Sequence, residues 1–233
     1  MFLAARRKCG SVNMFHKLLA EKQEHYFAYL RRHMAKEQLE ARGITDRRLL
    51  DAFIALPRHR FVPVELWTRC HDDCALQVLD GQTISQPYIA VLMAQLAEIK
   101  GGEKVLEIGT GTGYSAALLA ALGAEVYTVE INARLFNFGA RPLAQYAPGV
   151  TRLLGDGAKG WPEHAPYDRI VFTCAPETLP PGIEKQLRPG GLLVAPLGVD
   201  TQRLKIFRMD EGLTETADAG SVAFVPLVKR EKE

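Results

Sequence analysis

Short apolar runs alternate with longer amphipathic or alanine-rich segments between residues 87 and 196. The apolar runs predict β-strands at 104–108, 125–129, 150–154, 168–173 and 192–196. The segments before and between them predict helices at 87–99, 114–122, 132–146 and 180–187. Strands that alternate with helices of this length are typical of an open, mostly parallel sheet with helices on both faces. The pattern therefore predicts an α/β, Rossmann-like domain.

The chain before residue 87 has helical rather than alternating patterns. Residues 15–42 are dense in Leu, Ala, Glu, Lys and Gln and predict one helix, which Gly43 ends. Thr45 or Asp46 can cap a second helix, whose apolar positions have helical spacing until the next proline stops it. Residues 63–80 predict a short helix with irregular or strand-like pieces. This part is expected to form an N-terminal helical cap on the sheet.

The C-terminal part of the chain ends the alternation of strands and helices. Two strand-like runs, 203–208 and 221–227, predict a pair of antiparallel strands.

The same patterns predict how the chain divides into parts. Residues 1–33 form an N-terminal extension, and residues 34–233 form a single domain. Within that domain, 34–100 supply the helical cap and a substrate segment, and 101–233 supply a cofactor-binding Rossmann-like core.

Composition narrows the class of protein. The chain has 233 residues, is 47% hydrophobic and has a formal net charge of +2. This balance gives no broad nucleic-acid footprint, and no apolar run reaches the ~18–20 residues of a membrane span. Four cysteines without a disulfide framework predict reduced thiols and a cytoplasmic protein, with an organelle transit segment in the basic N-terminus as the alternative. A monomer is expected, and a dimer is the alternative.

Three residues in a short segment suggest a metal cluster only weakly. Cys70, His71 and Cys74 lie close together in the sequence, but two further ligands at usable spacing are missing. We therefore expect no metal site.

A glycine-rich turn after the strand at 104–108 predicts a cofactor site. Glycines 109, 111 and 113 allow the backbone to approach a ligand, and a helix follows whose N-terminus favours an anion. Glu107 precedes the turn, where an acid can meet the amino-acid end of a cofactor, directly or through water. The spacing differs from the G-x-G-x-x-G of dinucleotide sites and favours S-adenosylmethionine, with an NAD-type oxidoreductase as a distant alternative.

Two further strand ends carry acids suited to the same cofactor. Glu130 ends the second strand, where a carboxylate can accept both ribose hydroxyls. Asp156 and Gly157 follow the third strand, where the Asp side chain can accept a bond from the adenine amino group. The alternative is that Asp156 caps a turn between glycines.

The octapeptide 81–88, Gly-Gln-Thr-Ile-Ser-Gln-Pro-Tyr, is the most informative segment of the chain. Its Ser85 could cap the helix that begins at Pro87. A nucleophilic serine is less consistent with the sequence, because no G-x-S-x-G elbow surrounds it. The residues alone leave capping and substrate binding open.

Several segments in this order resemble the protein-L-isoaspartate (D-aspartate) O-methyltransferase family. They are 38–46, 57–63, 81–88, 106–114, 155–162, 187–191 and 224–227, so the resemblance covers roughly Met34 to Leu227. It implies a class I methyltransferase fold that binds S-adenosylmethionine, with S-adenosylhomocysteine as a product. It implies substrates that are proteins and peptides containing isoaspartyl residues. By the same resemblance Ser85 lies at the transfer centre and binds the substrate carboxylate, with Thr83 and Ile84 beside it.

Some features leave other functions open. Asp80 precedes the octapeptide, where a charge facing the pocket would repel a carboxylate, so we expect it to point to solvent. A carboxylate methyltransferase with another substrate, or a non-catalytic adaptor that keeps the fold, are the alternatives. His59, His71 and His164 are not expected to act as bases, because an ionised carboxylate needs none.

Overall fold

A single mixed sheet forms the centre of the computed structural model, which describes residues 8–229, with side chains from residue 21 onward. Within that range the sheet has seven strands in the order β5-β4-β3-β6-β7-β8-β9. The first five strands in this order are parallel, and β8 and β9 add antiparallel pairs at one edge. The bounds are β3 (Lys104–Ile108), β4 (Glu125–Glu130), β5 (Thr151–Leu154), β6 (Tyr167–Phe172), β7 (Leu187–Leu197), β8 (Gln202–Met209) and β9 (Leu213–Val222).

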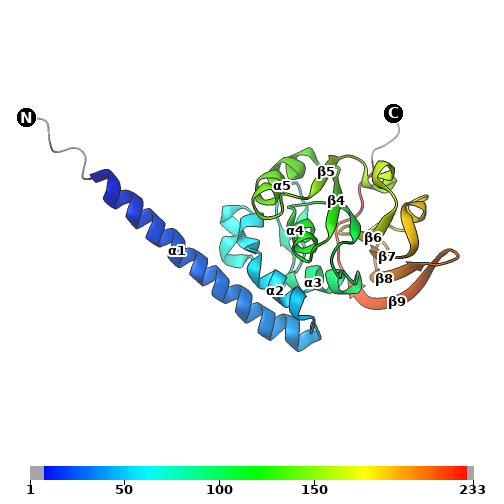
Figure 1. Ribbon diagram of the computed structural model, residues 1–233, viewed down its shortest axis with the longest axis horizontal. Helices are drawn as coiled ribbons and strands as arrows, with labels where there is room; N and C mark the ends of the chain where they lie inside the picture. The colour runs from blue at the N-terminus through cyan, green and yellow to red at the C-terminus, as the bar shows by residue number, and fades with distance from the viewer. Residues whose placement is uncertain (1–7, 230–233) are drawn as a thin grey trace, which may run out of the picture.

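Among the described residues, three α-helices precede the sheet in the chain, and α4 and α5 connect its strands β3, β4 and β5 (Figure 1). Their bounds are α1 (Lys8–Met34), α2 (Arg47–Ala55), α3 (Pro87–Leu96), α4 (Tyr114–Ala121) and α5 (Ala133–Tyr146). Asp46 caps α2 by accepting from the amide of Arg48, and Asn132 caps α5 by accepting from two backbone amides. The predicted cap at Asp46 and the helix start at Pro87 are confirmed.

Alternate side chains of the strands build two separate cores, as the period of two in a strand requires. Val105, Val171 and Val194 face the core that contains the α-helices. Leu106, Ile170 and Leu193 face the other core, which is covered by short 3-10 helices at Gly157–Lys159, Pro162–His164 and Glu184–Gln186. The predicted open, mostly parallel sheet with an N-terminal helical cap and C-terminal antiparallel strands is confirmed.

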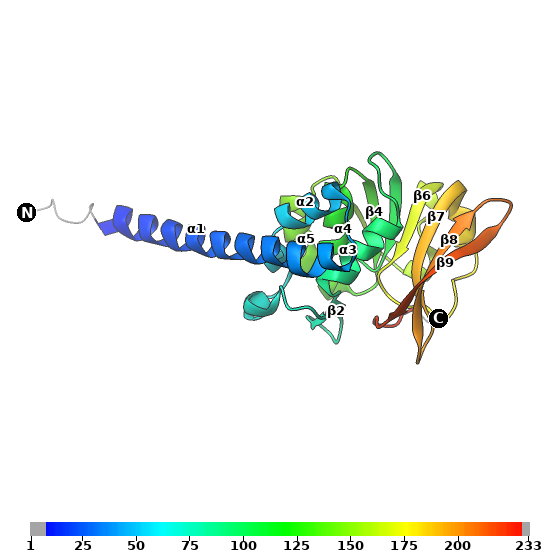
Figure 2. The same cartoon turned by 90° about the horizontal axis from the view of Figure 1, so that it is seen from below.

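The N-terminal helix extends away from the rest of the molecule in both views (Figures 1 and 2). Its second half is nevertheless part of the fold, because Phe27 is 3% exposed in the helical core and the Arg31 Nε donates to the carbonyl of Ile54 at 2.7 Å. The helix continues through a π-helix at Ala35–Leu39 and a 3-10 turn at Glu40–Arg42, and Gly43 ends it with φ 88°. The division at residue 34 stays a prediction.

Two predicted elements were wrong. The segment 180–187 is not an α-helix: Gly182 has φ 88° after two prolines, only the 3-10 turn Glu184–Gln186 forms, and β7 begins at Leu187. The second antiparallel strand is β9, Leu213–Val222, rather than 221–227, since a mostly exposed edge strand lacks the apolar alternation that the prediction used. The helix predicted at 87–99 ends at Leu96.

The octapeptide lies between the cap and the sheet. A small antiparallel ribbon, β1 (Leu76–Gln77) with β2 (Thr83–Ile84), precedes α3. Two 3-10 helices, Arg58–Phe61 and Val64–Arg69, lead into it. The short helix and strand-like pieces predicted for 63–80 are confirmed, and the ribbon carries Thr83 to Ser85 toward the sheet.

Candidate functional site

A cavity of about 320 Å³ lies where β3, β4 and β6 end. Six stretches of chain meet there: the octapeptide with the start of α3, the glycine loop, the turn after β4, the turn after β5, the residues after β6 and a C-terminal segment. Its lining includes Thr83, Ile84, Ser85, Gly109, Gly111, Tyr114, Glu130, Asn132, Gly157, Thr173, Cys174, Val225 and Leu227. The carboxyl ends of parallel strands are where open α/β sheets bind ligands.

The three glycines of the loop serve two different purposes. Gly109 and Gly111 line the cavity with φ 98° and 54°. Gly113, with φ 87°, does not line it; a Cβ there would lie 2.7 Å from Leu143 Cγ. The first two glycines therefore shape the cavity, and the third allows α5 to pack against the start of α4.

Glu130 lies at the cavity wall and binds the backbone of two neighbouring loops. Its Oε2 accepts from the amide of Gly111 at 2.7 Å, and its Oε1 accepts from the amide of Asn132 at 2.8 Å. The carboxylate is therefore fixed in orientation, with lone pairs remaining for the hydroxyl donors of a ligand.

Glu107 lies beneath the glycine loop and does not itself line the cavity. It is fully buried, its Oε2 accepts from the Thr128 hydroxyl at 2.6 Å, and its Oε1 has no partner among the described residues. Burial raises the pKa of Glu107 to about 7. The Thr128 hydroxyl lies 2.7 Å from that of Thr110, which does line the cavity. The acid is thus connected to the cavity through hydroxyl groups.

Ser85 faces the cavity together with Thr83 and Ile84 of the ribbon. The residue that caps α3 is Gln86, without a side-chain bond, so the capping reading of Ser85 is wrong. The Ser85 hydroxyl makes no hydrogen bond with the described residues, which leaves it available to a ligand.

Asp156 and Gly157 differ in their position relative to the cavity. Gly157 lines the cavity, and a Cβ at this position would lie 2.7 Å from Ile108 Cγ2. Asp156 does not line the cavity; its side chain accepts from the amide of Ala158 at 3.0 Å and caps a 3-10 turn. An adenine contact of Asp156 stays a prediction.

The histidines and cysteines near the site do not supply a base or a nucleophile in the cavity. His59, His71 and His164 are absent from its lining, and burial lowers the pKa of both His59 and His71 to about 3. Cys174 lines the cavity, but burial raises its pKa to about 12, so the thiol stays protonated.

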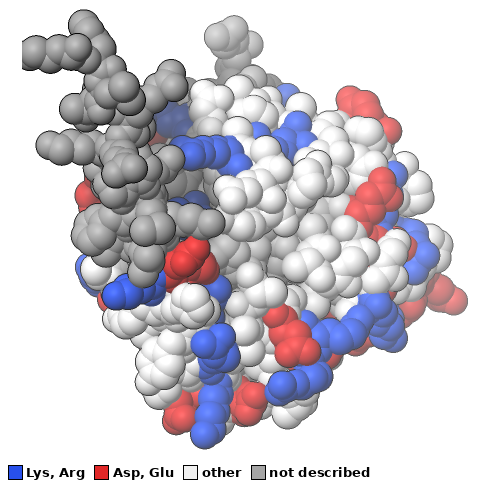
Figure 3. Space-filling model, turned by 60° about the vertical axis from the view of Figure 1, so that its left-hand side comes forward, with Lys and Arg blue, Asp and Glu red and all other residues white. Residues whose placement is uncertain are grey.

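The charged residues of the surface are mixed. Figure 3 shows Lys and Arg interspersed with Asp and Glu on one face of the molecule. Within residues 8–229, no helix is long and apolar enough to cross a membrane. No cluster of three or more His, Cys, Asp or Glu that could hold a metal ion occurs in the same part of the chain.

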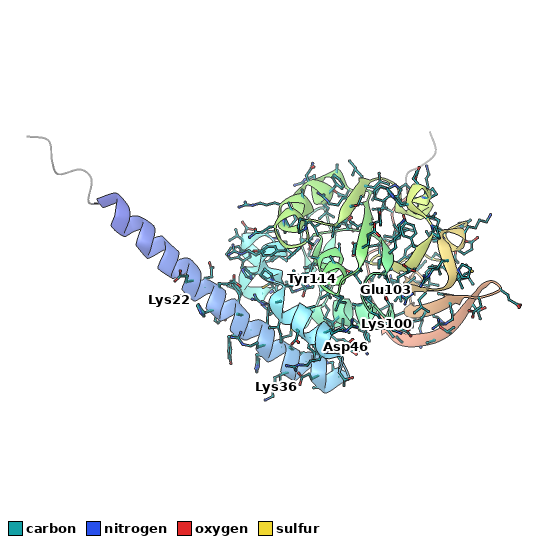
Figure 4. The ribbon with its side chains drawn as sticks, viewed as in Figure 1. Lys22, Lys36, Asp46, Lys100, Glu103 and Tyr114 are labelled. Atoms are coloured by element: carbon teal, nitrogen blue, oxygen red, sulfur yellow. The ribbon has the colours of Figure 1, made fainter. Side chains whose placement is uncertain are left out.

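Several residues of the cavity were not predicted as site residues. Thr110 and Asn132 come from turns next to predicted residues, and Leu135 from the first turn of α5. Asn132 could have been found because it follows Glu130 by two positions. For Tyr114 the sequence leaves a cofactor contact open. It lies inside the fold between the cap and the sheet (Figure 4), is 2% exposed and lines the cavity. Sequence spacing alone gave no signal for Arg58, which lies directly behind Ser85.

Comparisons with known proteins point to one family. The sequence model of the protein-L-isoaspartate (D-aspartate) O-methyltransferase family matches residues 31–232. A protein-L-isoaspartate O-methyltransferase of Gloeobacter violaceus is 43% identical over 86% of this chain and 99% of its own. One of Opitutus terrae is 45% identical over 85% of this chain and 87% of its own.

Solved structures of proteins with the same family name are also similar, at lower sequence identity. A protein-L-isoaspartate O-methyltransferase structure has a TM-score of 0.75 at 27% identity and covers 84% of this chain, which spans 65% of that one. A Plasmodium falciparum structure of the same type, in complex with S-adenosyl-L-homocysteine, has a TM-score of 0.75 at 20% identity, covering 88% of this chain and 99% of its own. The second likeness supports the fold alone.

Proposed function

The chain belongs to the protein-L-isoaspartate (D-aspartate) O-methyltransferase family, and we infer from this that it methylates isoaspartyl carboxylates with S-adenosylmethionine. The substrate group is the α-carboxylate that becomes a side-chain-like branch when Asn deamidates or Asp isomerises. One observation carries the assignment of the site: Thr83 to Ser85 and the glycine loop line the same cavity. Substrate-side and cofactor-side segments, 24 or more positions apart in the sequence, thus meet at one place.

The residues of the cavity fit the cofactor. Beneath the cavity, the buried Oε1 of Glu107 has no hydrogen-bond partner among the described residues and suits a cationic amino group, and Glu130 at the cavity wall suits ribose hydroxyls. A Cβ at Gly111 would meet nothing within 4 Å, so its absence leaves open space for a ligand. Gly109 and Gly157 instead let the cavity backbone pack closely against Thr173 and Ile108. When bound, S-adenosylmethionine supplies an electrophilic methyl group on a sulfonium centre.

The chain's own residues have to orient a nucleophile rather than create one. An isoaspartyl α-carboxylate is ionised at neutral pH, so no general base is needed. We propose that the Ser85 hydroxyl donates to one carboxylate oxygen and leaves the other free to react. Ile84, Val225 and Leu227 give the cavity apolar walls that exclude water.

The charge of the cavity fits this task. No Lys or Arg belongs to its lining in the described part of the chain. A direct ionic clamp would stabilise the carboxylate more than the transition state, in which its charge is being neutralised, and would slow the transfer. A hydroxyl donor holds the carboxylate more weakly and so preserves the rate.

A second hollow of about 380 Å³ shares Thr83 and Ser85 with the cavity. It continues past Gln86 and Ile89 to the end of β9 and the residues after it, which include Val222 and Phe224. We propose that an extended, flexible segment of the damaged protein lies here, with its isoaspartyl residue at Ser85.

The product pair is a methyl ester and S-adenosylhomocysteine, and the ester then closes to a succinimide that partly returns to aspartate. We propose a cytoplasmic monomer that repairs proteins, with residues 34–233 as one domain, no metal and no nucleic-acid or membrane partner.

Radiolabelled methyl transfer to an isoaspartyl peptide, measured beside its aspartyl twin, tests the function. Labelling of the isoaspartyl peptide alone is expected. Equal labelling of both twins would reject the repair reading, and labelling of free acids in preference to the peptide would favour a different carboxylate substrate. Cofactor binding without transfer to either peptide would support the adaptor alternative.

A further inference from the structure

Arg58 lies directly behind the octapeptide, in the short 3-10 helix Arg58–Phe61. It is completely buried. Its Nη2 donates to the backbone carbonyl of Ser85 at 2.6 Å, and its Nε donates to the carbonyl of Cys70 at 2.7 Å. Hydrogen bonds from a charged donor at these distances are among the strong ones, so the Ser85 peptide is held from outside the cavity.

The same guanidinium also contacts the cofactor side of the site. Its central carbon lies 4.7 Å from the centroid of the Tyr114 ring, a cation–π distance. Tyr114 begins α4 immediately after the glycine loop and lines the cavity. One side chain thus connects the segment that carries Ser85 with the helix that follows the cofactor loop.

This cation has no carboxylate partner in the described part of the chain. Its contacts are two carbonyl groups and an aromatic ring, and its Nη1 has no hydrogen-bond partner there. Burial lowers the pKa of Arg58 from its ordinary value. A buried charge without a counter-ion is costly, so a neutral residue would be preferred here if the role were packing alone.

We propose that Arg58 is a positioning residue for methyl transfer, which acts through Ser85. The Ser85 hydroxyl has no bond of its own among the described residues, so its direction depends on the backbone that carries it. Arg58 fixes that backbone by its bond to the Ser85 carbonyl. The inference rests on the proposed role of Ser85 at the substrate carboxylate.

A double-mutant cycle between Arg58→Lys and Ser85→Ala tests this. Lysine keeps the charge but cannot hold two divergent carbonyls with a planar fork. We expect Arg58→Lys to lower kcat on an isoaspartyl peptide about tenfold, while the Kd for S-adenosylhomocysteine changes less than twofold. In the Ser85→Ala background the same change should lower kcat less than twofold, because no hydroxyl remains to be positioned.

Arg169 provides the matched control. It is 8% exposed and donates to the carbonyls of Ala97, Asp168 and Glu98, but it does not line the cavity. Arg169→Lys should lower the Tm about as much as Arg58→Lys does, but should leave kcat unchanged. If Arg58→Lys does not fold, Arg58→Gln, which buries no charge and keeps an amide donor, takes its place in the cycle.

The outcomes separate the two levels of the argument. Equal losses of kcat from Arg58→Lys in both backgrounds, or no loss in either, would overturn the positioning role and leave the role of Ser85 standing. Unchanged turnover by Ser85→Ala alone would overturn the role of Ser85 and this inference with it.

Discussion

The carboxylate of Asp80 forms an ion pair with the guanidinium of Arg134, 54 positions further along the chain. It also accepts from the side-chain amide of Asn132 at 3.0 Å. Asp80 therefore connects the segment before the octapeptide to the N-terminus of α5, and it is absent from the lining of the cavity. The expectation that Asp80 points to solvent is only partly right, because its side chain is 25% exposed and its charge is paired.

The first prediction concerns this pair. Arg134→Ala leaves the Asp80 charge unbalanced beside Asn132, which lines the cavity, so KM for the anionic peptide should rise a few-fold at low salt. The expected change in KM is this small because an exposed ion pair contributes only about 0.2–1 kcal/mol of interaction free energy. Steady-state kinetics at low and at high ionic strength measure the effect, which added salt should weaken.

The double variant Asp80→Asn with Arg134→Ala is the control. Removing both charges should return KM to the parent value. A KM that stays raised in the double variant would show that Arg134 acts by some route other than Asp80.

The second prediction concerns Ser85. Ser85→Ala removes the proposed hydroxyl donor to the carboxylate, and a hydrogen bond to a charged group is worth about 1.5–3 kcal/mol. We expect kcat on an isoaspartyl peptide to fall about 10- to 100-fold. Calorimetric titration with S-adenosylhomocysteine should give an unchanged Kd, and parental turnover by the variant would contradict the assigned role.

The third prediction concerns Glu107 and pH. Burial raises the pKa of Glu107 from 4.5 to about 7, so the folded protein keeps a proton that the unfolded chain releases. The free energy of unfolding should therefore fall as the pH rises from about 4.5 to about 7, by about 3 kcal/mol in total. Glu107→Gln should remove this slope, so the variant should be more stable than the parent at pH 8 and equally stable near pH 4.

The same residue should make cofactor binding depend on pH. A cationic amino group near Glu107 favours the ionised carboxylate, so binding releases a proton and tightens between about pH 6 and pH 8. Titrations of S-adenosylhomocysteine across this range should show the trend in the parent and lose it in Glu107→Gln. If Glu107→Gln binds S-adenosylhomocysteine as tightly as the parent at pH 8, Glu107 does not contribute to cofactor binding.

The fourth prediction contrasts two glycines of one loop. A Cβ at Gly113 would lie 2.7 and 2.8 Å from Leu143 Cγ and Cδ1, and Leu143 is itself buried. Gly113→Ala combines this overlap with a positive φ and should lower the free energy of unfolding by about 2–5 kcal/mol.

Gly111→Ala is the comparison for that change. Its Cβ would meet nothing within 4 Å, so only the strain of its φ of 54° remains, about 1–2 kcal/mol. Urea unfolding should rank Gly113→Ala below Gly111→Ala, whereas cofactor binding should suffer in Gly111→Ala. The reverse order of stability would contradict the division of roles in the loop.

Much of the fold could be predicted because the parallel strands are apolar runs next to clear turn signals. The parallel strands, the cap at Asp46 and the helix start at Pro87 follow from local chemistry. The edge strand β9 could not be placed because its polar residues pair through backbone groups, which any side chain allows. The helix predicted at 180–187 failed for a different reason: its prolines and Gly182 outweigh the helical composition of the segment.

The site was predictable to the extent that its residues follow strands in sequence. Gly109, Gly111, Glu130 and Gly157 line the cavity for this reason. Arg58 could not be found, because its relation to Ser85 crosses 27 positions and involves only a backbone carbonyl on the receiving side. Glu107 illustrates the opposite case: its position could be predicted, but its burial and raised pKa required the three-dimensional structure.

The C-terminal wall of the cavity is attached differently from the rest. Val225 and Leu227 belong to no strand, and an isolated parallel bridge joins Pro226 to Ala175 through two backbone hydrogen bonds of 2.8 Å. Detaching this wall breaks few bonds and leaves the sheet intact, so it should open far more often than the protein unfolds. In native-state hydrogen exchange, the amides of Ala175 and Leu227 should therefore exchange before those of β3 and β6, and bound product should slow them selectively.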